Sequence, residues 1–219
     1  MRLIDVSHTI EAGLITYKGL PAPLICDFLS HTDSHRVYAE GTEFAINKIE
    51  MVGNTGTYID APYHRYPDGL DLADLALDSV ANLPGLVVRA TARAGRAIDR
   101  DAFANLDLRG MAVLVHTGWD ARWNTDAYFE GHPYLTAAAA TYLRDSGTTL
   151  VGIDSLNIDS TDDGHRPVHT TLLGANIPIV EHLCNLRDLP DTGFRFFAAP
   201  IKVRRFGSFP VRAFGIVGE

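Results

Sequence analysis

The sequence is poor in cysteine and has no excess of positive charge. Its two cysteines, Cys26 and Cys184, lack the spacing of a metal-binding or redox motif, so no disulfide is expected. Lysine and arginine number 19 against 27 aspartates and glutamates, which gives a formal net charge of −8. Because nucleic acids are bound through clustered positive charge, this balance argues against a nucleic-acid partner and favours a small-molecule substrate or a protein partner.

Long apolar runs are also absent. The first residues, MRLIDVSHTI, lack the apolar core of a signal peptide, and no stretch is long enough to span a membrane. We therefore expect a soluble cytoplasmic protein that does not engage a membrane. Of the 219 residues, 46% are apolar, and no linker or repeat interrupts them. Residues 1–219 are accordingly expected to form a single domain.

Short apolar runs rich in β-branched residues are spread along the chain. Such runs, bounded by Gly, Pro or Asp, are typical of the interior strands of a covered sheet. Residues 43–52 alternate between apolar and polar with one slip, which predicts a half-buried strand with a bulge. The other expected strands are at 2–5, 86–88, 111–115, 150–153 and 177–180, followed by two final strands in the C-terminal tail.

Helical patterns lie between these runs. Residues 133–147 predict a helix, because Pro133 suits a first turn and Gly147 suits the position just past a helix end. Shorter helices are expected at 99–104 and 168–173. Strands interleaved with helices indicate one α/β domain.

The segment GNTGTYIDAPYHRYPDG, residues 53–69, combines glycines and prolines with chemically active side chains. Proline restricts both itself and the preceding residue, so Pro62 stiffens the segment that holds Asp60 and His64. Such rigidity suits a segment that holds side chains at fixed positions. An ordinary loop, with a capping aspartate and a solvated histidine, is an equal alternative from this segment alone.

A second candidate segment is DGHRPVHTTLLGANIPIVEHL. His169 falls on a short apolar stretch, and Glu181 follows an expected strand, at the edge of the sheet where ligands bind in many α/β folds. An imidazole and a carboxylate form a plausible half-site for a divalent cation. The alternative for Glu181 is a helix N-terminal residue stabilised by the helix dipole.

These residues, together with the stretches HTGW and VGIDS between them, resemble the cyclase family, which includes bacterial kynurenine formamidases and isatin hydrolases. The resemblance extends from IDVSHTI to SFPVRAFGI. It implies a swivelling β/β/α fold with a mixed central sheet, an arylformamidase-like activity of the kind used in tryptophan catabolism, one or two divalent metals, and a homodimer or homotetramer.

The family motif is HxGTHxDxPxH, and the resemblance implies a role for each matching residue. Asp60 would bridge two metals, His169 and Glu181 would hold the second metal, and His64 would serve as general acid or base. Asn54 and Tyr58 stand where the motif has its first two metal-binding histidines. An amide oxygen is a poor ligand for zinc or manganese, and a phenol ligates well only when ionised.

We therefore predict a reduced metal site. One Zn or Mn ion would be held by Asp60, His169 and Glu181, or the site would bind no metal and use Asp60 and His64 as an acid/base pair. Tyr58 is the predicted catalytic hydrogen-bond donor to a substrate oxyanion. Asn54 and Trp119 are the predicted substrate-binding residues.

The predicted activity is hydrolysis of a small cyclic or aryl amide or lactone, with water activated by a metal, by His64 or by both. Two alternatives remain open at the level of sequence. One is a metal-free cyclase or isomerase of secondary metabolism. The other is a catalytically inert member of the family that retains the pocket for ligand binding.

Overall fold

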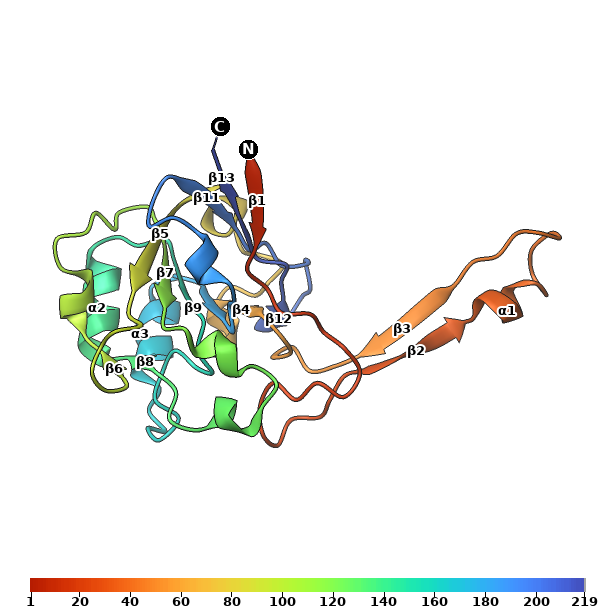
Figure 1. Cartoon of the computed structure of the whole chain (residues 1–219), viewed down its shortest axis with the longest axis horizontal. Coiled ribbons are helices and arrows are strands. Elements are labelled where there is room, and N and C mark those ends of the chain that lie inside the picture. The colour runs from red at the N-terminus through yellow and green to blue at the C-terminus, as the bar shows by residue number, and fades with distance from the viewer. Residues whose placement is uncertain (219) are drawn as a thin grey trace.

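A mixed sheet of nine strands forms the body of the protein (Figure 1). The computed structural model describes residues 1–218. The nine strands are β1 (Arg2–Asp5), β4 (Tyr58–Asp60), β5 (Leu83–Arg89), β7 (Ala112–His116), β9 (Leu150–Ile153), β10 (Ile179–Glu181), β11 (Phe194–Phe197), β12 (Ser208–Pro210) and β13 (Phe214–Val217). They lie in the order β1-β13-β11-β5-β7-β9-β10-β4-β12. The predicted α/β class and mixed central sheet are confirmed.

The centre of this sheet is parallel and its flanks are antiparallel. Strands β5, β7, β9 and β10 run parallel to one another, whereas β4 pairs antiparallel with both β10 and β12. The predicted interior strands correspond to the four parallel strands. The tail forms three strands, β11, β12 and β13, where two were expected.

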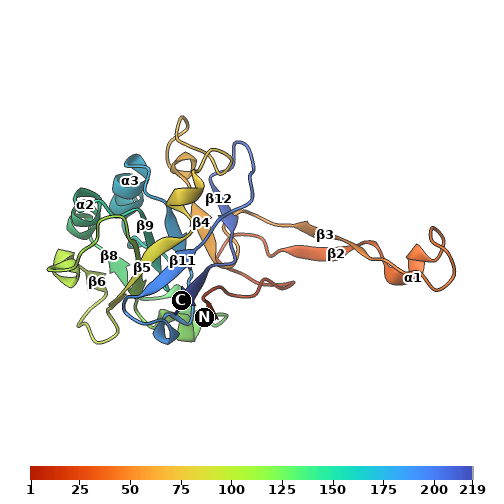
Figure 2. The ribbon, with the colours of Figure 1, turned by 90° about the horizontal axis from the view of Figure 1, so that it is seen from above.

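Two α-helices, α2 (Ala137–Asp145) and α3 (Pro167–Gly174), cover one face of the sheet (Figure 2). Helix α2 begins later than predicted, because the side chain of Thr136 caps it by accepting a hydrogen bond from the backbone of Ala139. The residues just before it form the short strand β8 (Tyr134–Leu135), which pairs with β6 (Ala97–Ile98). The helix ends as predicted, with Gly147 at a φ of +78°.

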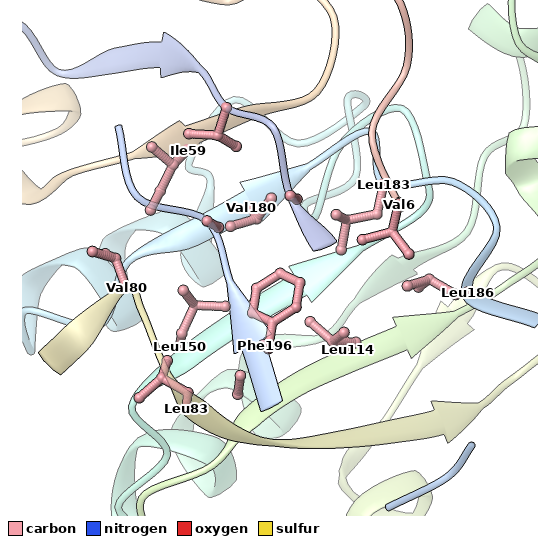
Figure 3. Packing of buried hydrophobic residues seen from close by; sticks show 14 of the residues in the cluster. Val6, Ile59, Val80, Leu83, Leu114, Leu150, Val180, Leu183, Leu186 and Phe196 are labelled. Atoms are coloured by element: carbon pink, nitrogen blue, oxygen red, sulfur yellow. The ribbon is translucent and has the colours of Figure 1, made fainter. Parts of the chain in front are cut away.

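A second apolar core packs against the opposite face of the sheet (Figure 3). Phe196 of β11 is fully buried there and lies near Leu114, Leu150 and Val180 of the parallel strands (Figure 3). Burying a phenylalanine of this kind stabilises the fold by about 1.5–3 kcal/mol. This core fixes the strand ends that carry the site described below.

A hairpin projects far from the body (Figures 1 and 2). It consists of β2 (Leu24–Leu29) and β3 (Ile46–Glu50), with the single helical turn α1 (His31–Ser34) near its tip. We call residues 24–50 the arm. The predicted strand is present, but every residue of β3 is exposed, so the prediction that it is half-buried is wrong. The alternation is present, but no part of residues 1–218 covers the strand.

Short 3-10 helices connect the remaining elements. They are η1 (Pro62–His64), η2 (Leu77–Ser79), η3 (Arg100–Phe103), η4 (Trp119–Arg122), η5 (Asp126–Phe129) and η6 (Leu186–Asp188). Helix η3 corresponds to the helix expected at 99–104. Both cysteines are free. Within residues 1–218 no helix has the length and apolar character needed to cross a bilayer.

Candidate active site

Four candidate residues meet where β4 and β10 lie side by side. The antiparallel register places Tyr58 opposite Glu181 and Asp60 opposite Ile179. Helix η1 follows β4 directly and turns the chain so that His64 Nδ1 lies 3.8 Å from Asp60 Oδ1. The stiff segment therefore delivers both side chains to one place, as the sequence predicted.

Helix α3 brings His169 to the same place. Asp159 accepts hydrogen bonds from the backbone N–H groups of Val168 and His169, and its Oδ2 lies 2.7 Å from His169 Nδ1. This contact assigns the Nδ1 proton to the bond with Asp159 and turns Nε2 toward the site. Nε2 lies 3.6 Å from Asp60 Oδ2 and 3.7 Å from Glu181 Oε1.

The donor set fits one divalent cation. Asp60 Oδ2 is buried and has no hydrogen-bond partner among residues 1–218. Its separation from His169 Nε2 is too long for a hydrogen bond, but two ligands of one Zn²⁺, each at about 2.0–2.2 Å from it, lie roughly 3–4 Å apart. An aspartate–histidine contact behind the ligating imidazole, as from Asp159 to His169, is the usual outer support of such sites.

His64 is a second candidate for the third ligand. Ligand atoms of Asp60, His64 and His169 all lie within 4.8 Å of one another. Glu181 also remains within reach of His169, although its Oε1 accepts the backbone N–H of Ile158 at 2.7 Å. We keep Glu181 as the proposed third ligand, because its Oε1 lies 3.7 Å from His169 Nε2 and this choice leaves His64 Nε2 available as a base.

The electrostatics of the site favour a cation in the middle of these groups. Burial disfavours a charged His169 imidazole, but the carboxylates of Asp159 and Asp60 outweigh this and raise its pKa to about 10. Burial would raise the pKa of Asp60, yet the imidazoles of His64 and His169 hold it below the usual value. Burial raises the pKa of Glu181 to about 7. His169 Nε2 lies between the carboxylates of Asp60 and Glu181, so a cation held by these residues would take the place of a proton on this nitrogen.

Ser208 links Asp60 to His64. Strand β12 pairs with β4 so that Ser208 lies opposite Asp60. The Ser208 hydroxyl donates a short hydrogen bond to Asp60 Oδ1 and lies 2.8 Å from His64 Nδ1. Since the hydroxyl proton is used on Asp60, the Nδ1 proton of His64 is assigned to the bond with Ser208. This arrangement leaves His64 Nε2 as the basic nitrogen.

Tyr58 and Asn54 occupy the positions of the first two motif histidines. The Tyr58 hydroxyl donates to Glu181 Oε2 at 2.6 Å, and burial together with the nearby carboxylates raises the pKa of the phenol well above its ordinary value. A neutral phenol with its proton on Glu181 is a poor metal ligand. It can reach a substrate oxyanion only by giving up this bond, so the oxyanion role of Tyr58 stays a prediction.

A cavity of about 240 Å³ opens above these residues. It is lined by Tyr17, Leu20, Asn54, Tyr58, His64, Arg65, Asn157, Arg166, His169 and Glu181. The structure thus places Asn54 in the wall, where substrate binding was predicted.

Trp119 lies elsewhere, which corrects the expectation that it forms the wall of this cavity. Gly118 turns the chain at a φ of +75° as β7 ends. The indole nitrogen of Trp119 then donates to the carbonyl of Tyr128 at 2.9 Å, and the Arg122 guanidinium lies 4.1 Å from its ring. Its contacts are structural.

Sequence reasoning missed several residues of the site. Ser208 and Asp159 contact the predicted residues from β12 and from the loop before α3. No local pattern in the sequence links Asp159 to His169. Tyr17 and Asn157 also line the cavity. These four positions come from segments far apart in the sequence and come together only in the folded chain.

Known proteins resemble this chain in sequence and in fold. The sequence profile described as "Putative cyclase" matches residues 4–160. The kynurenine formamidase of Geobacillus thermodenitrificans is 31% identical over 176 residues, which cover 80% of this chain and 81% of that relative.

Two solved structures extend the likeness. Isatin hydrolase A from Labrenzia aggregata, bound to benzyl benzoate, superposes with a TM-score of 0.85 over all of this chain and 94% of its own, at 22% identity. Identity this low supports a shared fold only. A structure described as a potential metal-dependent hydrolase with cyclase activity gives a TM-score of 0.79 at 29% identity, over 98% of this chain and 96% of its own.

Proposed function

Because this chain belongs to the cyclase family and brings Asp60, His64, His169 and Glu181 together, we propose that it is an amidohydrolase of small aryl amides or related cyclic amides and lactones. The observation that carries the proposal is the contact of His64 Nδ1 with Ser208, 2.8 Å long, which leaves Nε2 free beside the Asp60–His169–Glu181 cluster. The name of the Geobacillus relative supports an aryl formamide as the nearest substrate type.

In the proposed reaction, His64 Nε2 takes a proton from the water molecule that attacks the carbonyl carbon. Asn54 lines the cavity, and its amide can donate a hydrogen bond to the developing oxyanion. The C–N bond then breaks, and His64 returns the proton to the leaving nitrogen. For formanilide the products are formate and aniline, with one water consumed.

Asp60, His169 and Glu181 would hold one Zn²⁺ or Mn²⁺. Such a cation polarises a carbonyl and lowers the pKa of water. Other residues of the chain orient these side chains. Asp159 fixes the ring orientation of His169. Tyr58 and the backbone of Ile158 hold Glu181 through hydrogen bonds of 2.6 and 2.7 Å.

The test is hydrolysis of formanilide and a panel of formanilides and lactones by the wild type and His64→Ala. General acid–base assistance typically contributes ~10²–10⁴-fold, so kcat/KM is expected to fall by that factor, with an unchanged circular dichroism spectrum. His35→Ala, on the exposed arm, is the matched control and keeps wild-type rates. Wild-type rates in His64→Ala would remove His64 from the mechanism.

A further inference from the structure

A second tyrosine, Tyr17, lies in the cavity wall beside the candidate reacting groups. It lines the same cavity as Tyr58, His64 and Glu181. Its ring contacts the imidazole of His182 edge to face, with the ring centroids 5.9 Å apart. Since His182 directly follows Glu181, the Tyr17 ring lies next to the strand end that carries this carboxylate.

The segment that carries Tyr17 is anchored to the body of the protein. Leu14 and Thr16, which precede Tyr17, are both buried. The Thr16 hydroxyl accepts a hydrogen bond of 2.8 Å from the backbone N–H of Gly56. Gly56 belongs to residues 53–69, the stiff segment that carries the candidate aspartate and histidine. The position of Tyr17 is therefore tied directly to the segment that holds the reacting groups.

The Tyr17 hydroxyl is free to donate a hydrogen bond to a ligand. It is buried and has no hydrogen-bond partner among residues 1–218. The neighbouring Asn157 is engaged elsewhere, because its amide nitrogen donates to Glu181 at 3.4 Å and its amide oxygen accepts the backbone N–H of Asp159 at 2.9 Å. Burial, reinforced by the Glu181 carboxylate, raises the pKa of the phenol, so the hydroxyl keeps its proton. Buried hydroxyls without a partner are uncommon, which indicates a role at the cavity.

The two tyrosines of the cavity wall differ in what their hydroxyls can do. The Tyr58 hydroxyl donates its one proton to Glu181 Oε2 at 2.6 Å, whereas the Tyr17 proton is not used within residues 1–218. A ligand group that faces Tyr17 must therefore supply an acceptor. In an amide or a lactone the carbonyl oxygen is the main acceptor.

We infer that the Tyr17 hydroxyl donates a hydrogen bond to the carbonyl oxygen of the bound substrate and to the oxyanion that forms from it. As the oxygen of water bonds to the carbonyl carbon, the π electrons of the C=O bond move onto the carbonyl oxygen. The water proton goes to His64 Nε2, and Tyr17 keeps its own. Tyr17 is thus a catalytic residue that acts as a donor beside Asn54. The oxyanion role rests on the proposed function, but the contact with a carbonyl oxygen does not.

Titrations with 1-indanone and indane, followed by NMR, test the carbonyl contact without turnover. The two molecules differ by one carbonyl group, and neither has a bond that hydrolysis can break. The ratio of their affinities, 1-indanone over indane, is expected to fall ~3–10-fold in Tyr17→Phe, the effect of one neutral hydrogen bond. Tyr142→Phe makes the same chemical change in α2, away from the cavity, and should leave the ratio unchanged. An unchanged ratio in Tyr17→Phe, or no binding of 1-indanone to the wild type, would overturn the inference.

Thermal unfolding separates this role from a structural one. Tyr17→Phe removes a buried hydroxyl that has no partner in the described chain, so the thermal midpoint should stay the same or rise. A lower midpoint would show that the hydroxyl stabilises the fold through the protein itself, which contradicts a free donor.

Turnover distinguishes this inference from the proposed function. Removing an oxyanion donor typically lowers kcat by ~10²–10³-fold, so Tyr17→Phe should lower kcat on the formanilide and lactone panel by at least ~10²-fold and raise KM by less than ~10-fold. A lower affinity ratio with an unchanged kcat would overturn the oxyanion role. If the wild type cleaves no member of the panel but the ratio still depends on Tyr17, the hydrolase proposal fails and the carbonyl contact stands. If the wild type cleaves the panel and Tyr17→Phe retains both the ratio and kcat, the inference fails and the hydrolase proposal stands.

Discussion

The body and the arm bury their apolar side chains to opposite extents. Phe196 in the body is fully buried, whereas Phe28 in the arm is 78% exposed. Leu24 and Ile25 are neighbours in β2 and so point to opposite faces of the ribbon, yet they are 54% and 40% exposed. The body thus carries its own core and site, whereas the arm has exposed apolar side chains on both faces that the rest of residues 1–218 does not cover.

A second copy of the chain is the partner that we expect to cover the arm. A two-stranded ribbon is marginally stable by itself in water. The segment from Leu24 to Glu50 falls within the roughly 20–30 residues that one partner contributes to a standard interface. In a two-fold dimer each arm can contact both the arm and the body of the other copy, which explains apolar residues on both faces. The predicted homodimer or homotetramer remains a prediction.

The largest contrast is expected from a matched pair of phenylalanine truncations. Phe196→Ala leaves a cavity in the body core and is expected to lower the free energy of unfolding by ~3–5 kcal/mol. Phe28→Ala removes an exposed ring and is expected to change it by less than ~0.5 kcal/mol in monomeric protein. Urea denaturation at low protein concentration measures both. Similar losses in the two variants would show that the arm belongs to the core.

The loss of folding stability at low pH is expected to arise in the body. Burial lowers the pKa of His182 from 6.5 to about 3, so the folded state keeps this imidazole neutral while the unfolded state gains a proton. The contribution of this neutral imidazole to the free energy of unfolding is present above pH 6.5 and is lost as the pH falls toward 3. The free energy of unfolding should drop by about 2 kcal/mol between pH ~6.5 and ~5 from this group.

The variant His182→Asn isolates that contribution. Asparagine tolerates the left-handed backbone at this position, where φ is +54°. Chemical denaturation across this pH range should show a shallower slope in the variant than in the wild type. An identical slope would mean that His182 is protonated in the fold.

A smaller effect is expected for charge substitutions at exposed apolar positions. Phe28→Asp places a carboxylate in the expected arm interface and should weaken self-association by at least ~10-fold, about 1.4 kcal/mol. Leu77→Asp is the matched control, since Leu77 is 73% exposed on the body. Sedimentation velocity over a dilution series measures both. An unchanged association constant for Phe28→Asp would remove the arm from the interface.

The sequence identified the parts of the site that local patterns define. The stiff run around Pro62 predicted that Asp60 and His64 face one site. Apolar patterns predicted the helix that carries His169 and the strand that Glu181 follows. Ser208 could not be assigned, because its contact with Asp60 depends on the pairing of strands separated by most of the chain.

The arm marks the other limit of sequence reasoning. Alternation in residues 43–52 shows that apolar side chains share a face, but not what covers that face. A covering surface from another molecule produces the same pattern as one from the same chain. The prediction that Trp119 binds substrate was wrong for a related reason. The turn at Gly118 directs its indole toward the Tyr128 carbonyl, and no local pattern in the sequence indicates this contact.

The metal content of the purified protein tests the central claim, a one-cation hydrolase site in the body, most directly. Elemental analysis after expression with Zn²⁺ and Mn²⁺ and removal of loosely bound metal should give about one cation per chain, because the proposed ligands Asp60, His169 and Glu181 would hold a single ion. Asp60→Asn, checked for folding by circular dichroism, should lose it. Two cations per chain, or none after soaking with either metal, would contradict the account.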